Sequence, residues 1–212
     1  MSAHKTPKHS IIVCHPSRDS FTCTVANRYA LAVQRARHEV VLRDLYAIGF
    51  DPVLKDAERP STNGSVLADD VEKELSLLAG SDIFVLIYPI WFGLPPAMLK
   101  GYVDRVFGAG FSHRAVREQM MHPLMTGKAL LSFTSSGSSR AWLEEQGAYE
   151  SLRTVFDTYI RHAFSLASAR HVHFPNIVEN SKKSYIDECL FEVEEEAREA
   201  AAALLLPSLD RK

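Results

Sequence analysis

The chain has 212 residues and a formal net charge of −2, with 46% hydrophobic and 24% charged residues. These values are typical of one sizeable globular domain, here residues 1–212. The near-zero charge argues against nucleic acid as a main partner. Three cysteines without CxxC spacing form no disulfide framework, and a polar start without any long apolar run predicts neither a secretory signal nor a membrane span. We therefore expect a cytoplasmic protein.

Apolar runs alternate with amphipathic segments along the chain. The predicted strands are residues 10–14, 38–45, 82–89, 128–134 and 169–175. The predicted helices are residues 20–37, 66–80, 96–107, 142–166 and 183–205. Regular strand–helix alternation predicts a three-layer α/β fold, in which a five-stranded parallel sheet of order 2-1-3-4-5 has helices on both faces. Residues 46–64 form a long loop with two prolines and two glycines, and loops of this length are usually functional or mobile.

Ligands of such folds bind beyond the carboxyl ends of the strands, where the strand order reverses. The first loop there, "CHPSRDSFT", runs into a helix N-terminus, which favours an anion. Its hydrogen-bond donors are His15, Ser17, Ser20 and Thr22, and Arg18 adds positive charge. No GxxxxGK[ST] motif occurs and no GxGxxG follows the first strand, so nucleoside triphosphate hydrolysis is not expected. The alternative is that these hydroxyls only cap the helix.

Two further loops end at the same edge of the predicted sheet. "YPIWFGLPP" exposes Trp91 and Phe92 beside Gly93, and "FTSSGSS" brings small residues whose backbone can approach a ring. A phosphate cradle, a flat aromatic surface and backbone donors together predict a flavin site. The alternative for the two aromatic residues is a place in the core or in a dimer contact.

The stretches that carry these loops resemble a known family. They are "HPSRDSF" (15–21), "RDLYAIGFDPVL" (43–54), "YPIWFGLPPAMLKGYVDRVFGAGFS" (88–112) and "GKALLSFTSSG" (127–137). In these stretches the chain resembles the NAD(P)H:quinone oxidoreductases of the flavodoxin-like fold, a group that includes DT-diaphorase and the ancillary oxidoreductases of potassium efflux systems. The likeness covers roughly residues 9 to 175.

The resemblance implies a flavin-dependent, two-electron ping-pong reductase that acts as a homodimer. NAD(P)H would pass a hydride through the flavin to a quinone or another flat acceptor. The "HPxxxSF" form resembles FAD-binding members, with FMN as the alternative. The implied cofactor-binding residues are His15, Ser20, Phe21 and Thr22 at the phosphate, Pro89, Ile90, Trp91, Phe92 and Gly93 along the ring, and Thr134, Ser135, Ser136 and Gly137 at its pyrimidine edge.

Two other functions belong to different classes. Some members of the group bind and activate a potassium efflux channel, so a regulatory flavoprotein subunit with a membrane-transporter partner is the main alternative. An electron-transfer carrier is the third, although true flavodoxins bind phosphate with a different Ser/Thr-Gly loop.

The chain departs from the family near residues 140–150. Better-known members carry a tyrosine and a histidine there, proposed to steady charge on the reduced flavin. Here Trp142 and Tyr149 fall near those places and no histidine does. We therefore expect Tyr149 to donate a hydrogen bond at the flavin, without a histidine-assisted proton relay.

Four other residues carry chemistry outside these motifs. His171 and His173 share one face of the last strand and are expected at a surface or interface, with a zinc pair as the lesser alternative. Asp104 and Arg105 are expected on a solvated helix face or in a dimer salt bridge. Cys14 is expected to be a small buried hydrophobe, with a thiol nucleophile as the alternative. No metal ion is predicted.

Overall fold

The computed structural model describes residues 5–59 and 66–205. The strands are β1 (Lys8–Val13), β2 (Glu39–Asp44), β3 (Ile83–Pro89), β4 (Ala129–Ser135) and β5 (Ser168–Phe174). All neighbours are parallel, in the order β2-β1-β3-β4-β5. This confirms the predicted flavodoxin-like sheet, and each strand lies within two residues of its expected bounds.

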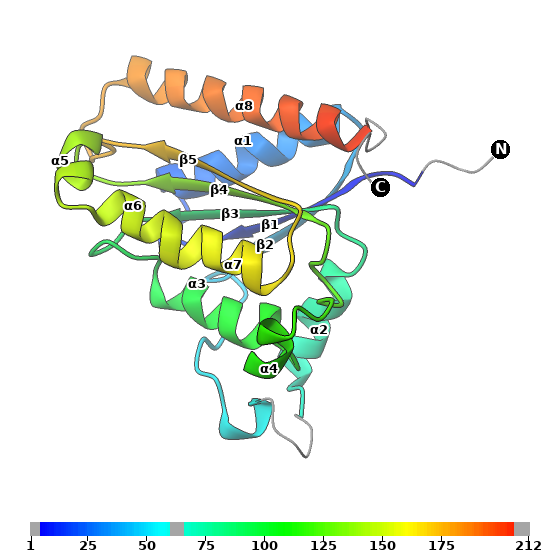
Figure 1. The fold of residues 1–212 in the computed structure, drawn as a ribbon. Helices are drawn as coiled ribbons and strands as arrows, with labels where there is room; N and C mark the ends of the chain where they lie inside the picture. The colour runs from blue at the N-terminus through cyan, green and yellow to red at the C-terminus, as the bar shows by residue number, and fades with distance from the viewer. Residues whose placement is uncertain (1–4, 60–65, 206–212) are drawn as a thin grey trace.

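Helices cover both faces of the sheet (Figure 1). The α-helices are α1 (Phe21–Arg35), α2 (Asp69–Leu78), α3 (Ala97–Tyr102), α4 (His113–Arg117), α5 (Arg140–Glu145), α6 (Ala148–Leu152), α7 (Tyr159–Ala163) and α8 (Lys183–Leu205). The other helical turns are η1 (Asp56–Glu58), η2 (Val103–Phe107) and η3 (Arg153–Thr158). None of the helices within the described residues is both long and apolar enough to cross a membrane.

The two faces of the sheet have separate cores. On one face α1 and α8 pack together on residues such as Ile11, Val85 and Phe133. On the other face α3, η2, η3 and α7 pack on residues such as Leu86 and Tyr88. The alternation of side chains along each strand thus sends one set of residues to each core. It also places Ser132 and Thr134 of β4 on the second face, among the helices that follow the site loops.

Two of the predicted helices are not continuous α-helices. Residues 97–107 begin as α3 and continue as the π-helical η2. Residues 140–163 divide into α5, α6, η3 and α7, and the left-handed Gly147, with φ of 64°, separates α5 from α6. Apolar spacing does not distinguish α- from π-helical turns, and π-turns are frequent at functional sites. Short α4 and η1 were not predicted, and residues 60–64 of the predicted long loop lie outside the described residues.

The predicted surface position of Arg105 is wrong. Its side chain is 2% exposed and its guanidinium bonds Glu58 and Asp70, each at 2.7 Å. Arg105 and Glu58 are buried together because residues of the 46–59 loop, among them Phe50 and Asp51, pack on the Arg105 side chain, whereas Asp70 is 46% exposed. Asp104 does lie on the outer helix face, where it accepts a hydrogen bond from Lys100 at 2.6 Å. Arg105 therefore fastens the 46–59 loop to the core.

Candidate functional site

The first site loop joins β1 to α1. Ser20 is the N-cap of α1, and its hydroxyl accepts a hydrogen bond from the Cys23 amide at 3.2 Å. His15 Nδ1 accepts one from the Ser17 amide at 3.0 Å. Within the described residues, the amides of Phe21 and Thr22 donate to no protein acceptor. The loop therefore combines the capping function that was the alternative with amide donors at the positive end of a 15-residue helix.

At Phe21 and Thr22 the backbone amides, rather than the side chains, are the groups available to a ligand at this loop. The Phe21 ring packs edge-on against Phe174 at 5.5 Å between centroids, and Thr22 is buried. Of the predicted phosphate donors, the structure thus leaves His15, Ser17 and the exposed Arg18 side chain at the surface of this loop.

The second site loop ends in a tight turn after β3. Trp91 and Leu94 exchange backbone hydrogen bonds of 3.0 and 3.1 Å around Phe92 and Gly93. Both central residues have positive φ, 51° at Phe92 and 81° at Gly93, which is the geometry of a type I′ turn. A phenylalanine in this conformation is strained, and strain of this kind gathers at functional sites. The Phe92 ring is fully exposed, so it is not a core residue, and no other side chain of the described residues covers it.

The third site loop follows β4 and is joined to the second. The Ile90 amide donates to the Ser135 carbonyl at 2.7 Å, and Pro89 pairs in register with Ser135. Thr134 and Ser135 are buried, whereas Gly137 is exposed. The first loop also reaches this edge, because the His15 ring lies 5.8 Å from the Trp91 ring. All three loops therefore meet at one edge of the sheet, as predicted.

A cavity of about 430 Å³ opens between the second and third loops. The predicted residues in its wall are Ile90, Phe92, Gly93, Ser136 and Gly137. Residues not assigned to the site from the sequence complete the wall, namely Ser138, Trp142, Leu143 and Ala148. Ser138 belongs to the third site loop, and the other three come from α5 and the start of α6. Trp142, a tryptophan just after a predicted ligand loop, was the sequence signal that could have found them.

A second hollow lies on the other side of the first loop. It measures about 390 Å³ and is lined by Arg18 and by residues of α1, β2 and the turn after β2, among them Asn27, Asp44 and Ala47. Sequence reasoning did not find it, because its walls come from segments that carry no aromatic or glycine signal.

Tyr149 follows Ala148 of the cavity wall and lies next to two histidines of β5. It is 5% exposed, and its ring centroid lies 5.6 Å from that of His171 and 5.4 Å from that of His173. Burial raises the pKa of its hydroxyl, while Arg140 and Arg153, stacked on the ring, oppose that shift.

The expected surface position of these histidines is wrong. The His171 side chain is 2% exposed and contacts the buried Asp157 of η3. Burial, His171 and Arg140 together lower the pKa of His173 to about 4. These side chains of β5 face inward because α6 and η3 cover that end of the sheet. The sequence of an edge strand does not by itself show that helices cover it.

Neither a Cys14 nucleophile nor a metal-binding cluster among the described residues explains the site. Burial raises the pKa of the Cys14 thiol to about 12, and its side chain is fully buried. This confirms Cys14 as a small core residue and leaves no thiolate nucleophile there. Among the described residues, no group of three or more His, Cys, Asp or Glu side chains could hold a metal ion.

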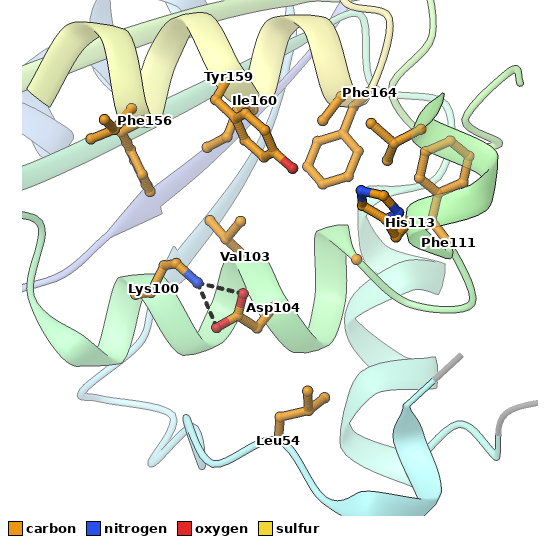
Figure 2. Close-up of a pocket in the computed structure, with 14 residues that line it drawn as sticks. Leu54, Lys100, Val103, Asp104, Phe111, His113, Phe156, Tyr159, Ile160 and Phe164 are labelled. Carbon is orange, nitrogen blue, oxygen red and sulfur yellow. Dashed lines mark hydrogen bonds and ion pairs between the residues drawn. The ribbon is translucent and has the colours of Figure 1, made fainter. Parts of the chain in front are cut away.

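An apolar groove of about 290 Å³ lies away from the site loops, between η2 and the η3–α7 segment (Figure 2). Phe156, Ile160 and Phe164 form one wall, and Leu54 of the 46–59 loop approaches from the opposite side. The charged groups in it, Lys100 and Asp104, are paired with each other. The groove therefore offers mainly apolar contact, with His113 and Tyr159 as its other polar side chains.

Comparison with known proteins agrees with this geometry. A protein from Haemophilus influenzae, named an uncharacterized NAD(P)H oxidoreductase, is 34% identical over 145 residues, 68% of this chain and 71% of that protein. The guinea-pig (Cavia porcellus) NAD(P)H dehydrogenase [quinone] 1 is also 34% identical, over 60% of this chain and 53% of its own length. The chain thus spans only about half the length of that enzyme.

A solved structure of an NAD(P)H:quinone oxidoreductase from Methanothermobacter marburgensis superposes with a TM-score of 0.80 and 25% identity, covering 92% of this chain and 98% of that one. The family model described as "Flavodoxin-like fold" matches residues 7–201. The chain therefore belongs to the family of proteins with the flavodoxin-like fold.

Proposed function

We propose that the chain is a flavin-dependent NAD(P)H:quinone oxidoreductase. The observation that carries the proposal is the cavity between the turns at 90–93 and 136–138, which lies at the same sheet edge as the amides that begin α1. The relatives named as NAD(P)H oxidoreductases and quinone dehydrogenases support the same activity.

The residues present fit a flavin. The amides of Phe21 and Thr22, which have no partner among the described residues, together with the Ser17 hydroxyl and Arg18 of the same loop, are donors of the kind that bind a phosphate. Phe92 and Trp142 give the cavity a flat aromatic lining, and the backbone at Gly93 and Gly137 carries no side chain to keep a ring away.

A bound flavin would supply the hydride chemistry, taking two electrons and a proton from NAD(P)H and passing them to the acceptor. The chain would do the rest. The turn at 90–93 would hold the ring edge, Trp142 would shield one side from water, and the 134–138 turn would present backbone donors to the polar rim. Tyr149 would steady negative charge there through its hydroxyl, as the sequence predicts.

We propose FAD rather than FMN. The hollow of about 390 Å³ beside Arg18 adjoins the phosphate loop on the side away from the ring cavity, and Asn27 and Asp44 give it polar edges. A ribose and an adenine beyond a pyrophosphate would need such a space, which FMN would leave unused.

We also propose a homodimer that forms over the apolar groove of Figure 2. Val155 and Tyr159 on its rim are more than half exposed, and apolar side chains gathered in this way mark contact surfaces. The cytoplasmic location and a membrane-transporter partner stay predictions.

The decisive experiment is to mix the purified chain separately with FAD, FMN and riboflavin and to measure flavin fluorescence quenching and the melting temperature. We expect FAD to bind more tightly than FMN, and both more tightly than riboflavin, which has no phosphate. Trp142→Ala should weaken binding of all three flavins. Trp91→Ala is a separate test of the turn at residues 90–93. Absence of binding by every flavin would overturn the proposal. Tight binding with no NAD(P)H oxidation in the presence of a quinone would favour the regulatory subunit instead.

A further inference from the structure

A row of polar side chains crosses the otherwise apolar core beneath the third site loop. They come from β4, β5 and η3, on the sheet face that α6 and η3 cover. The row consists of Ser132, Asp157, His171, Thr134, His173 and Ser136. One end is deeply buried at Asp157, and the other end, Ser136, forms part of the cavity wall. Neither the family resemblance nor the motifs assign a role to the two β5 histidines.

The hydrogen bonds in this row can be assigned from its cavity end. The Ser136 hydroxyl donates to the Ser138 carbonyl at 2.9 Å, so Ser136 Oγ must accept from His173 Nε2 at 3.2 Å. A hydroxyl has only one proton to donate, and a carbonyl oxygen can only accept. His173 is therefore protonated on Nε2. Its low pKa, about 4, makes it neutral at pH 7, so its Nδ1 is an acceptor.

The same assignment of donors and acceptors continues towards the buried end of the row. His173 Nδ1 accepts from the Thr134 hydroxyl at 2.9 Å, and Thr134 Oγ1 in turn accepts from His171 Nε2 at 2.7 Å. The Val172 carbonyl, at 3.5 Å, is a weaker acceptor for the Thr134 proton. His171 Nδ1 faces a carboxylate oxygen of Asp157, whose other oxygen accepts from Ser132 at 2.9 Å. One extra proton is therefore held between His171 and Asp157.

Ser132 and His171 Nδ1 donate towards Asp157, whereas every donor from His171 Nε2 onward points away from it, towards Ser138. A chain with this polarity can pass one proton along without moving any heavy atom far. We propose that Asp157, His171, Thr134, His173 and Ser136 form a proton relay that delivers a proton from the buried His171–Asp157 pair to the acceptor bound in the cavity. The inference rests on the proposed function, because it assigns the source of a proton that the proposed reaction consumes.

The proton balance of that reaction leaves one proton unaccounted for. Conversion of a quinone and NAD(P)H to a hydroquinone and NAD(P)⁺ needs a hydride, which carries two electrons and one proton, and one further proton. In the relay the His171 Nε2–H bond breaks as a Thr134 O–H bond forms, and the earlier Thr134 proton moves to His173 Nδ1. The Ser136 hydroxyl turns its hydrogen from the Ser138 carbonyl to the acceptor oxygen; that proton then leaves to the acceptor as the His173 Nε2 proton passes to Ser136. His171 ends neutral beside the Asp157 carboxylate, and His173 ends protonated on Nδ1. A proton from water restores the His171–Asp157 pair, and the hydroxyls and the His173 ring turn back to their starting orientations before the next transfer.

The charged and titratable groups around the relay are compatible with this direction. Tyr149 of α6 lies over both histidines, and Arg140 of α5 and Arg153 of η3 stack on its ring. Tyr88 of β3 is fully buried near Asp157, and its hydroxyl has no partner within the described residues. Burial, the neighbouring His171 and the Arg140 guanidinium disfavour a positive charge on His173, so the extra proton stays at the His171 end until it is needed.

The first test needs no flavin. Nitrogen-15 NMR of the imidazole rings in the apoprotein at pH 7 reports which ring nitrogens carry protons. We expect His171 to be protonated on both nitrogens and His173 on Nε2 alone. A neutral His171, or His173 protonated on Nδ1 alone, would overturn the relay whether or not the chain binds a flavin. Failure to bind any flavin would instead overturn the proposed function.

The second test separates the two half-reactions of the flavin-loaded protein by stopped flow. Thr134→Val removes the relay hydroxyl without changing the side-chain shape, and His173→Gln keeps a donor to Ser136 but cannot accept and pass a proton. Each should slow quinone reduction about 100-fold, the usual contribution of a proton donor, and abolish its solvent isotope effect. Flavin reduction by NAD(P)H should change less than about twofold, because hydride transfer to the flavin does not draw on the relay.

His38→Gln is the matched control. His38 belongs to a second buried histidine pair at the opposite end of the sheet, 2.9 Å from His9, and should leave both half-reactions unchanged. Equal slowing of both half-reactions in the Thr134 and His173 variants would indicate loss of structure and overturn the relay. Unchanged quinone reduction in both variants would overturn it as well.

Discussion

Two pairs of buried histidines lie at opposite ends of the sheet, and they differ in what they touch. At the amino-terminal end, His9 Nδ1 lies 3.0 Å from the Tyr29 hydroxyl and His9 Nε2 lies 2.9 Å from His38. His38 Nε2 is buried without a partner in the described part of the chain. At the carboxyl end, His171 contacts an ionisable carboxylate and the row of hydrogen bonds ends at a cavity.

The difference shows that a buried histidine is not by itself a sign of function. In the amino-terminal pair neither ring contacts a carboxylate directly. Burial and His38 lower the pKa of His9 to about 4 and burial lowers that of His38, against the opposing charge of Asp82, so both rings are neutral at pH 7. The carboxyl-end pair holds one ring against Asp157 and a neutral ring against the site loop. A counter-charge on one side and an opening on the other are what permit proton transfer.

The largest change in stability is expected from removing the Asp157 carboxylate, which contacts His171 of the carboxyl-end pair. Asp157→Ala would leave the His171 ring without its carboxylate in a site where that ring is 2% exposed. Removing one partner of a buried ion pair costs about 3–5 kcal/mol. We expect a loss of this size in the free energy of unfolding, measured by urea denaturation at pH 7.

The matched control is Glu150→Ala, in a surface pair with Arg153. Exposed pairs contribute at most about 1 kcal/mol, so this variant should unfold close to the native midpoint. Equal losses from the two substitutions would show that Asp157 is not an ionised partner of His171.

The next effect concerns pH and the amino-terminal pair. The pKa of His9 is lowered from 6.5 to about 4 in the folded chain, so the unfolded chain binds more protons between those values. Its contribution to stability is fully present above pH 6.5 and is lost as the pH falls towards 4. The difference amounts to about 3 kcal/mol for a fully buried ring.

His9→Gln should therefore flatten the dependence of the unfolding free energy on pH between 6.5 and 4. His173 has a similarly low pKa, so His173→Gln should flatten the same window. Activity distinguishes the two variants, because only His173→Gln should slow quinone reduction. A pH profile that neither substitution changes would contradict the assignment of both rings as neutral.

The sequence predicted the parts of the fold and site that depend on local patterns. The five strands and their order followed from apolar runs and alternation, and the meeting of three loops at one sheet edge followed from the position of each strand end. What it missed depends on contacts between distant segments. His171 was expected at a surface because nothing in "ARHVHF" shows that α6 and η3 cover it. Arg105 was placed in solvent for the same reason, since Glu58 and Asp70 are 47 and 35 residues away in sequence.

The smallest effect compares backbone strain at the two ends. Phe92 at the site and Arg37 near the start of β2 both have positive φ, 51° and 62°. Asparagine tolerates this conformation better than either residue. Phe92→Asn and Arg37→Asn should therefore each raise the free energy of unfolding of the apoprotein by up to about 1 kcal/mol, measured by urea denaturation.

Ligand binding should separate these two variants. The Phe92 ring lines the cavity, and its exposure means that its removal costs no core packing. Phe92→Asn should weaken flavin binding while it stabilises the fold, and Arg37→Asn should leave binding unchanged. If Phe92→Asn binds flavin as tightly as the native chain, the strain at 92 serves the turn alone. In that case Trp142 and the 136–138 backbone would form the contact surface without it, because they line the same cavity together with Ile90, Gly93, Leu143 and Ala148.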